Sequence, residues 1–215
     1  RPMTTIDIIS DLVCPWCYIG LRRLDAAIAN VRQEFPDFSC AMRWRPFFLN
    51  PDTPPEGEPY LPFLEKKFGG PAPVVALFER VRAAGRPWGV DYAFEKIQVR
   101  ANTLQAHRLI HWAQQRGDAA RLVERLFVAQ FQRGERIGDR SLLVQLAVEC
   151  GYPADAVERY LASGADTDEV RAMERSYRAM GISMVPTFIV DGLEVVVGAE
   201  DPAILAAAIR RTLGR

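Results

Sequence analysis

The chain has 215 residues, 49% of them hydrophobic and 25% charged, and its 27 basic and 27 acidic residues balance to a formal charge of zero. This composition predicts a globular protein with a sizeable hydrophobic core. A balanced charge provides no basic field for nucleic acid or anionic lipid, and no apolar run approaches the roughly 20 residues of a membrane span. We therefore expect partners that are small molecules or proteins, and neither a nucleic acid nor a membrane.

The first residues, Arg1-Pro2-Met3, lead directly into a β-branched run, without the charged leader and apolar segment of a secretory signal. Unless a leader has been removed, we expect a cytoplasmic protein. Four cysteines in a chain of this length are no disulfide framework, and cytoplasmic thiols are kept reduced. A Cys-x-x-Cys pair in this setting indicates catalysis or redox sensing.

Two cysteines lie where a predicted strand meets a predicted helix. Residues 4–10 alternate polar and apolar side chains, and apolar residues recur at helical spacing through residues 15–34, so Cys14 falls at the helix start. The free N–H groups and dipole of a helix N-terminus favour a thiolate, the form that attacks disulfides. Cys17 lies one turn deeper, within bridging distance, and Pro15 suits the first turn. We expect the Cys14 sulfur to be anionic and reachable from solvent.

Other roles for these cysteines are weaker. A three-residue loop makes a poor structural disulfide because it removes little chain entropy. A zinc site needs a second ligand pair, and the other candidates have no suitable spacing: Cys40, Cys150, His107 and His111. The two histidines lie four apart on one helical face without a nearby third ligand, so we expect no metal. Cys40 and Cys150 are expected to be buried as small hydrophobes.

The flanking segments complete an α/β pattern. Residues 38–49 read as a second strand, parallel to the first because a helix connects the two. Near the other end, residues 184–190 and 193–197 flank an Asp-Gly turn, which predicts a β-hairpin. Asp201 and Pro202 then begin a last helix that ends near residue 213.

The middle of the chain is predicted to be helical. Prolines between residues 46 and 59 break regular structure, and seven helical segments follow, separated by glycine, proline or aspartate. These segments are 60–69, 73–85, 102–116, 118–133, 139–150, 153–163 and 166–180. We therefore predict a discontinuous βαβ…ββα domain, residues 1–59 and 181–215, interrupted by a helical insertion domain, residues 60–180.

Five stretches give the chain a family resemblance over nearly its whole length. They are Cys14-Pro15-Trp16-Cys17-Tyr18-Ile19-Gly20, Arg45-Pro46-Phe47-Phe48-Leu49-Asn50, Asn102-Thr103-Leu104-Gln105-Ala106-His107-Arg108, and Val185-Pro186-Thr187-Phe188 with Gly198-Ala199-Glu200-Asp201. The chain resembles the DsbA family of thioredoxin-fold oxidoreductases, most closely its FrnE-like branch, which is related to 2-hydroxychromene-2-carboxylate isomerase and kappa-class glutathione transferase. The resemblance implies an α/β thioredoxin fold with a large all-helical insertion.

The resemblance also implies a cis peptide bond between Val185 and Pro186 that faces the Cys14 sulfur. Such a bond would leave the Val185 backbone free to pair with an extended peptide or with glutathione. The alternative is an ordinary proline of an edge strand.

The isomerase and transferase relatives replace the first cysteine with serine and use bound glutathione as the working thiol. Because this chain keeps both cysteines, dithiol exchange is favoured, although a glutathione site is not removed. By resemblance, Ala199 and Glu200 lie where those relatives hold the γ-glutamyl end of glutathione, and Asn50 makes another contact. The competing interpretation is that Asp201 caps its helix and Asn50 a turn.

Three further residues have candidate supporting roles. His107 lies on a helix that packs near the thiols in the family, so it lines the substrate cleft or serves only in packing. Asp11 is expected either to relay a proton when Cys17 resolves a mixed disulfide, or to serve in a turn or as an N-cap. Trp16 is expected to be partly exposed and to supply an apolar contact for substrate.

Together these features predict a thiol–disulfide oxidoreductase in which Cys14 attacks a substrate disulfide and Cys17 resolves the mixed disulfide. It would act on a disulfide-containing protein or small molecule, without a permanently bound cofactor and with glutathione as a candidate co-substrate. The alternatives are a glutathione-dependent isomerase or transferase, and a non-enzymatic redox sensor that binds a protein partner. The helical block could roof the substrate site or form the face of a homodimer.

Overall fold

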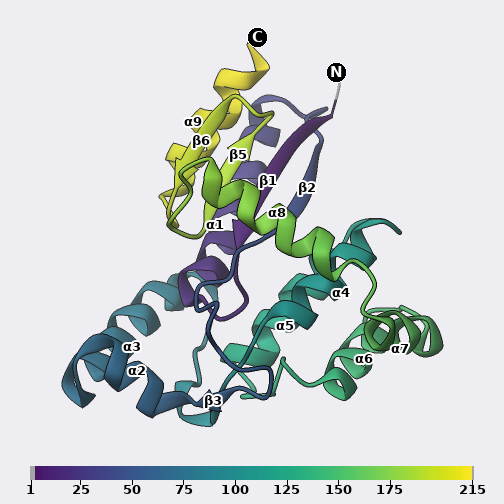
Figure 1. Ribbon diagram of the computed structural model, residues 1–215. Coiled ribbons are helices and arrows are strands. Elements are labelled where there is room, and N and C mark those ends of the chain that lie inside the picture. Colours follow the sequence, from purple (N-terminus) through teal and green to yellow (C-terminus); the bar gives the residue numbers. More distant parts are fainter. Residues whose placement is uncertain (1–2, 215) are drawn as a thin grey trace. The chain divides into compact units, whose positions relative to one another are not determined.

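The computed structural model describes residues 3–214, and Figure 1 shows its helices and strands in chain order. The first elements are β1 (Thr4–Ser10), α1 (Pro15–Glu34), β2 (Cys40–Pro46), β3 (Glu58–Pro59), α2 (Tyr60–Phe68), α3 (Pro71–Gly85), the 3-10 turns η1 (Arg86–Trp88) and η2 (Phe94–Lys96), and β4 (Val99–Arg100). The remaining elements are α4 (Leu104–Gln114), α5 (Ala120–Phe131), α6 (Arg140–Glu149), α7 (Ala154–Ser163), α8 (Thr167–Ala179), β5 (Thr187–Val190), β6 (Glu194–Val197) and α9 (Pro202–Leu213).

The backbone contacts divide the chain into two compact units. The sheet unit contains the residues up to Phe47 and from Arg171 onward, and the helical unit contains Phe48–Val170. Both divisions fall earlier in the chain than the domain boundaries expected at residues 59–60 and 180–181. One reason is that β3 pairs with β4, which ties residues 58–59 to the helical unit. Another is that the Arg178 guanidinium lies 4.2 Å from the Phe47 ring centroid, which ties the end of α8 to the sheet unit.

The sheet unit has the predicted βαβ…ββα order. Its strands are arranged β2-β1-β5-β6, with β1 parallel to β2 and antiparallel to β5, and β5 antiparallel to β6. The parallel register places Thr4 opposite Cys40 and Ser10 opposite Pro46. The parallel pairing follows from the long helical connection through α1, which returns the chain to the same end of the sheet.

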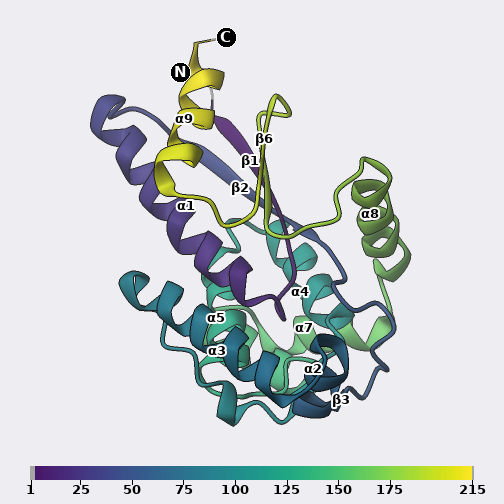
Figure 2. The ribbon, with the colours of Figure 1, turned by 90° about the vertical axis from the view of Figure 1, so that its left-hand side faces the viewer.

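The centre of the sheet unit is an apolar strand covered by two helices. Ile6, Ile8 and Ile9 of β1 are almost completely buried, as are Val31 of α1 and Ile209 of α9. Figure 2 shows α1 and α9 side by side along the sheet. Each such side chain contributes about 1.5–3 kcal/mol by leaving water, so this layer fixes where α1 begins relative to β1.

The hairpin between β5 and β6 has the predicted Asp-Gly turn. Asp191 and Gly192 both have positive φ angles, 51° and 67°, a conformation that aspartate tolerates and glycine favours. The structure adds a contact that the sequence did not indicate: the Thr5 N–H donates to the Asp191 carboxylate at 2.7 Å, and the Asp191 N–H donates to the Thr5 carbonyl at 2.7 Å. Asp191 therefore also joins the turn to β1.

The helical unit has its own core. The predicted helices are present, and their ends differ from the predicted ones by at most two residues, as is usual at helix termini. Beside them, Phe78 and Phe94 stack with ring centroids 4.1 Å apart, Tyr92 stacks on Phe94 at 5.1 Å, and Phe131 meets both Tyr92 and Phe94 edge-on. This aromatic cluster links α3 and α5 through η2. The short β3–β4 pair was not predicted, because two residues are too few to show a strand pattern.

Arg108 of α4 is a buried charge, 1% exposed, that binds backbone carbonyls. Its guanidinium donates to Ala165 O at 2.6 and 2.9 Å, to Tyr160 O at 3.0 Å and to Leu161 O at 3.2 Å. These carbonyls lie at the end of α7 and in the turn before α8, where helix ends leave carbonyls without intrahelical partners. Arg108 therefore fixes the α7–α8 turn against α4.

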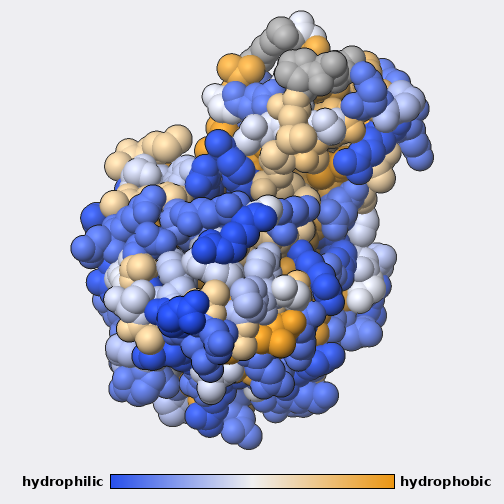
Figure 3. All heavy atoms as spheres, turned by 90° about the vertical axis from the view of Figure 1, so that its right-hand side faces the viewer, coloured by the Kyte–Doolittle hydropathy of each residue, from blue (hydrophilic) through white to orange (hydrophobic). Residues whose placement is uncertain are grey.

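The surface is largely polar, as expected when the hydrophobic residues form a core. Figure 3 shows one face of the molecule, on which hydrophilic residues predominate. Within residues 3–214, no helix combines the length and the apolar character needed to cross a membrane.

We predict that Arg108→Leu lowers the free energy of unfolding by about 3 kcal/mol or more, because it leaves several buried carbonyls without donors. The control is Arg116→Leu just beyond the end of α4, where an exposed guanidinium stacks on Trp112 at 3.8 Å and donates to the Trp112 carbonyl at 3.0 Å. Its loss should cost about 1 kcal/mol or less. Urea unfolding monitored by circular dichroism measures both, and equal effects of the two changes would contradict the role assigned to Arg108.

Candidate active site

The two thiols lie at the start of α1, as the sequence predicts. Cys14 is the N-cap residue with an extended backbone, and Pro15 occupies the first turn. The Cys14 N–H donates to Asp11 O at 3.1 Å, which closes a turn between β1 and the helix. The Cys17 N–H donates to Cys14 O at 3.1 Å, so the second cysteine follows the first by one turn.

The Cys14 sulfur faces the loop that precedes β5. Its thiol donates to the Val185 carbonyl with a sulfur–oxygen distance of 3.7 Å, and the Val185–Pro186 peptide bond is cis. Cys14 is only 5% exposed, so its sulfur is less accessible to solvent than the sequence predicted. The residues packed around the start of α1 cover most of its surface. In the described part of the chain, the thiols take no part in any group of three or more metal-binding side chains.

The Cys17 thiol is buried, and its surroundings disfavour its ionisation. It is 3% exposed, and burial raises the pKa of its thiol well above the usual range. A hydrogen bond with Cys14 and the negative charges of Cys14 and Asp11 raise the Cys17 pKa further, while a backbone hydrogen bond at Asp11 acts in the opposite direction. Cys17 therefore stays a neutral thiol near neutral pH. Asp11 is itself buried, with its carboxylate accepting from the Leu12 N–H at 2.9 Å.

Gly20 is a site residue whose role the sequence reasoning missed. A Cβ atom at this position of α1 would lie 2.8 Å from Pro186 Cγ and 3.3 Å from Phe188 Cζ. The missing side chain thus lets the helix lie directly against the cis-proline loop. An isolated glycine inside a helix costs about 1 kcal/mol relative to alanine, so its presence within the predicted helix was the sequence feature that could have indicated a close contact there.

The segment that follows β6 also contacts this loop. The Gly198 N–H donates to Pro186 O at 2.7 Å, and the Arg23 guanidinium of α1 donates to Ala199 O. Glu200 is exposed beside them. Asp201 caps α9, accepting from the Ala203 N–H at 2.8 Å, as the alternative interpretation of this residue expected. The glutathione-binding role of Ala199 and Glu200 stays a prediction.

Two of the predicted site residues, Asn50 and His107, belong to the helical unit. His107 is buried and packs edge-on against Phe48, with ring centroids 5.7 Å apart and planes at 71°. This is a packing environment, the simpler of its two expected roles.

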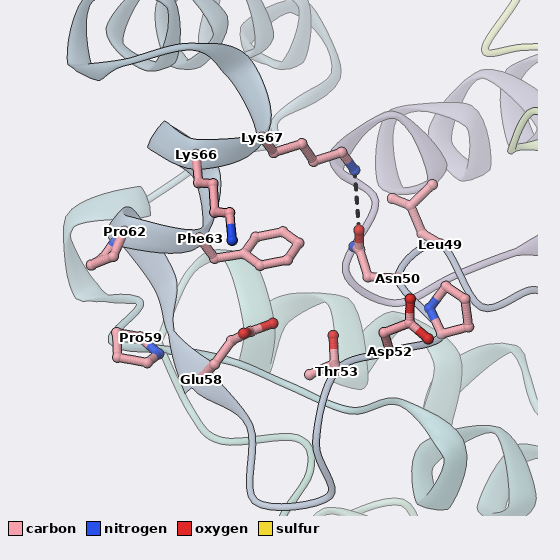
Figure 4. A pocket seen from close by; sticks show the side chains of 11 residues that line it. Leu49, Asn50, Asp52, Thr53, Glu58, Pro59, Pro62, Phe63, Lys66 and Lys67 are labelled. Carbon is pink, nitrogen blue, oxygen red and sulfur yellow. Dashed lines mark hydrogen bonds between the residues drawn. The ribbon is translucent and has the colours of Figure 1, made fainter.

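Asn50 lines a pocket of about 660 Å³ within the helical unit. Figure 4 shows its side chain facing Lys67 of α2, whose ammonium donates to Asn50 Oδ1 at 3.2 Å, with Phe63 and Thr53 beside the same space. The Asn50 Nδ2 and Thr53 Oγ1 atoms are buried without a hydrogen-bond partner among the described residues. Asp52 and Glu58 line the same pocket, which therefore combines charges of both signs, an apolar ring and unused polar atoms.

The remaining candidate residues are half-buried. Trp16 is half-buried, as predicted for a residue with one face available to a ligand, and so is Pro15. Cys40 and Cys150 are not buried as expected but half-buried, because they lie at the start of β2 and just after α6 rather than inside either element. Burial and nearby negative charge still raise the pKa of Cys150.

A Cys-x-x-Cys pair at the first turn of the helix after β1, set against a cis-proline before β5, defines a thioredoxin-fold protein of the thiol-redox class. The chain belongs to the DSBA-like thioredoxin domain family, whose sequence model matches residues 5–210. The fold class predicted from the sequence is thereby confirmed.

Individual relatives agree with this assignment. The structure of a probable DsbA oxidoreductase from Streptomyces coelicolor is 30% identical with a TM-score of 0.89, covering 99% of this chain and 91% of that one. A Bacillus subtilis protein, YwbO, is 27% identical over 95% of this chain and 94% of its own length. The cytosolic disulfide reductase DsbM of Pseudomonas aeruginosa, solved with glutathione, is 16% identical with a TM-score of 0.67, covering 98% of this chain and all of that one.

The isomerase relative implied by the sequence is also found among solved structures. A 2-hydroxychromene-2-carboxylate isomerase is 18% identical with a TM-score of 0.70, covering 97% of this chain and 96% of that one. At this identity, the likeness shows a shared fold.

We predict that Gly20→Ala destabilises the protein by about 1–3 kcal/mol, because the new methyl group overlaps Pro186 and forces the loop away. The sign of the effect is informative, since alanine in a helix free of such a contact would stabilise by up to about 1 kcal/mol. Urea unfolding measures the change, and a stabilised Gly20→Ala protein would contradict close packing between α1 and the loop.

The raised pKa of Cys17 predicts an unusual pH profile for its alkylation in Cys14→Ser, where burial, the largest cause of the shift, is retained. An acid with a raised pKa stays neutral to higher pH, so the rate of Cys17 modification by iodoacetamide should still be rising where an ordinary thiol, with a pKa of about 8.5, has levelled off. In urea the profile should return to that of an ordinary thiol. Mass spectrometry follows the modified peptide, and coincident native and unfolded profiles would show that burial does not protect Cys17.

Proposed function

We propose that the protein is a thiol–disulfide oxidoreductase in which Cys14 is the attacking sulfur and Cys17 the resolving one. The observation that carries the proposal is the unequal setting of the two thiols. Cys14 sits at the helix start against Val185 O, whereas Cys17 is held neutral behind it. Family membership supports the same class of chemistry.

The cycle conserves atoms and electrons. The Cys14 thiolate attacks one sulfur of a substrate disulfide, forms a mixed disulfide and releases the first substrate thiolate. Cys17 then attacks the Cys14 sulfur, forms the Cys14–Cys17 disulfide and releases the second thiolate. The substrate has been reduced by two electrons and the protein oxidised by two. Two molecules of a thiol reductant return the pair to its dithiol form.

The resolving step requires that Cys17 lose its proton. Because burial raises the pKa of Cys17, this proton needs an acceptor inside the site. Asp11 is suited to this role, since its charge acts on Cys17 and its carboxylate is buried beside the turn that carries the thiols. In the proposed mechanism Asp11 accepts the proton as Cys17 attacks and returns it when the dithiol is restored.

Substrate binding is assigned to the backbone next to Cys14. Val185 is half-buried, and its N–H has no hydrogen-bond partner within residues 3–214, so it is available to an extended peptide or to glutathione. Trp16 adds a half-buried aromatic surface on the helix start. This arrangement suits a disulfide flanked by extended backbone.

Glutathione is the proposed co-substrate that restores the dithiol, and the cytoplasm is the proposed location. Both proposals are supported by DsbM, described as a cytosolic disulfide reductase and solved with glutathione. The Asn50 pocket is lined by Lys66 and Lys67 and also by Asp52 and Glu58, so it suits a small ligand that carries both charges, as glutathione does. Direction of electron flow follows from the reduction potential of the pair relative to that of the compartment.

The test is turnover of glutathione disulfide and of insulin disulfides by wild-type protein and single variants. Cys14→Ala should lose at least about 100-fold in rate because the nucleophile is gone. Cys17→Ala should also stop multiple turnovers, whereas Cys150→Ala, a half-buried thiol in the helical unit, should stay within about twofold of wild type.

Two outcomes would contradict the proposal. Glutathione-dependent turnover of an aromatic substrate by Cys14→Ser would indicate an isomerase or transferase. Absence of disulfide turnover in wild type, together with partner binding that changes with oxidation, would indicate a redox sensor.

A further inference from the structure

Three side chains that can bind a metal ion meet in the helical unit, independently of the thiols. His111 lies near the end of α4, Asp166 in the turn before α8, and Glu169 in the first turn of α8. His111 Nε2 is 3.5 Å from Glu169 Oε2 and 3.9 Å from Asp166 Oδ2. The ligand atoms of all three residues lie within 4.8 Å of one another.

We propose that these residues bind one divalent transition-metal ion of the zinc type. Imidazole nitrogen and carboxylate oxygen are established ligands for zinc, which lies about 2.0–2.2 Å from each. In a tetrahedral site with such bonds, two ligand atoms are separated by about 3.4 Å. The observed separations from the His111 nitrogen are close to this value, so small side-chain rotations suffice to bring all three ligands to one ion. Water would take the fourth position.

The site is held in place by groups behind its ligands. Arg108 binds the carbonyl of Ala165, the residue before Asp166, and so fixes the backbone of the turn. The Tyr160 hydroxyl lies 3.0 Å from Asp166 Oδ2 and 3.0 Å from the Arg108 carbonyl, so its one proton is shared between two acceptors; a contact of this kind orients a ligating carboxylate.

The third ligand, Glu169, lies on the solvent-exposed side of the site, from which an ion would enter. The Glu169 side chain is 59% exposed and follows Asp166 by three positions, which brings both carboxylates to one side of the helix start. The His111 side chain is 14% exposed. The exposed Gln115 amide nitrogen lies 3.2 Å from His111 Nε2 and has to turn aside when the ion binds.

The alternative is an ion pair between protonated His111 and the two carboxylates, without a metal. The same distances fit that arrangement, so a metal titration separates the two interpretations. The chain suits such a titration because it contains two histidines, and the second, His107, is buried against Phe48 and serves as an internal reference.

The experiment is a titration of full-length, ¹⁵N-histidine-labelled protein with zinc chloride, followed by NMR of the imidazole signals. The His111 signals should shift and stop changing once one equivalent of zinc has bound at this site, while the His107 signals should not shift. Asp166→Asn and Glu169→Gln should each weaken the His111 response at least about tenfold. Asparagine tolerates the positive φ of 64° at position 166, so the turn is preserved.

The control variant is Asp168→Asn, which removes an equal charge from the same helical turn at an exposed position outside the cluster. It should change the apparent zinc affinity by no more than about twofold. His111 signals that do not move up to about 1 mM zinc would overturn the proposal, as would equal losses in Asp168→Asn and Asp166→Asn. Zinc bound at the thiols would leave the His111 signals unshifted and so would not be mistaken for this site.

Discussion

The close approach of the first turns of α1 to the Val185–Pro186 loop is the contact on which the sheet unit's chemistry depends. Pairing of β1 with β5 places Ile9 opposite Thr187, so the chain leaving β1 and the chain entering β5 meet at one edge of the sheet. Cys14 lies just beyond one strand and Val185 just before the other. The absence of a side chain at Gly20 then allows the helix and the loop to touch.

This contact makes the two thiols unequal. The turn from Asp11 to Cys14 brings the first sulfur to the Val185 carbonyl, and Cys17 lies one helical turn further on; both residues are buried. Desolvation of Cys17 penalises its anion, and the neighbouring negative charges act in the same direction. A sulfur at the helix start and a second one kept neutral support the proposed order, in which Cys14 attacks and Cys17 resolves, because a thiolate is the form that exchanges with disulfides.

Local features of the sequence predicted most of the fold. The alternation in residues 4–10 and the helical spacing of the middle segments depend on neighbouring residues, so they could be identified from the chain alone. The positions of both cysteines at the start of α1 follow in the same way. The cis bond at Pro186 came from family resemblance and agrees with the structure.

Contacts between distant residues could not be predicted. Gly20 appeared to be an ordinary helix residue because Pro186, which needs the space, is far along the chain. His111 lacked a third ligand in its own segment, and Asp166 and Glu169 reach it only because Arg108 fixes the α7–α8 turn. The openness of Cys14 was overestimated for the same reason, since the residues that cover a sulfur need not be its neighbours in sequence.

The most direct measurement of the central claim identifies the sulfur that first bonds to a substrate. Cys17→Ala and, in parallel, Cys14→Ala are mixed with a small excess of glutathione disulfide, quenched with acid at short times, and mapped by tandem mass spectrometry. The glutathione adduct should form on Cys14 of Cys17→Ala faster than on Cys17 of Cys14→Ala, and ahead of the half-buried Cys40 and Cys150. An adduct that forms first on Cys40 or Cys150, with Cys14 unmodified, would contradict the central claim.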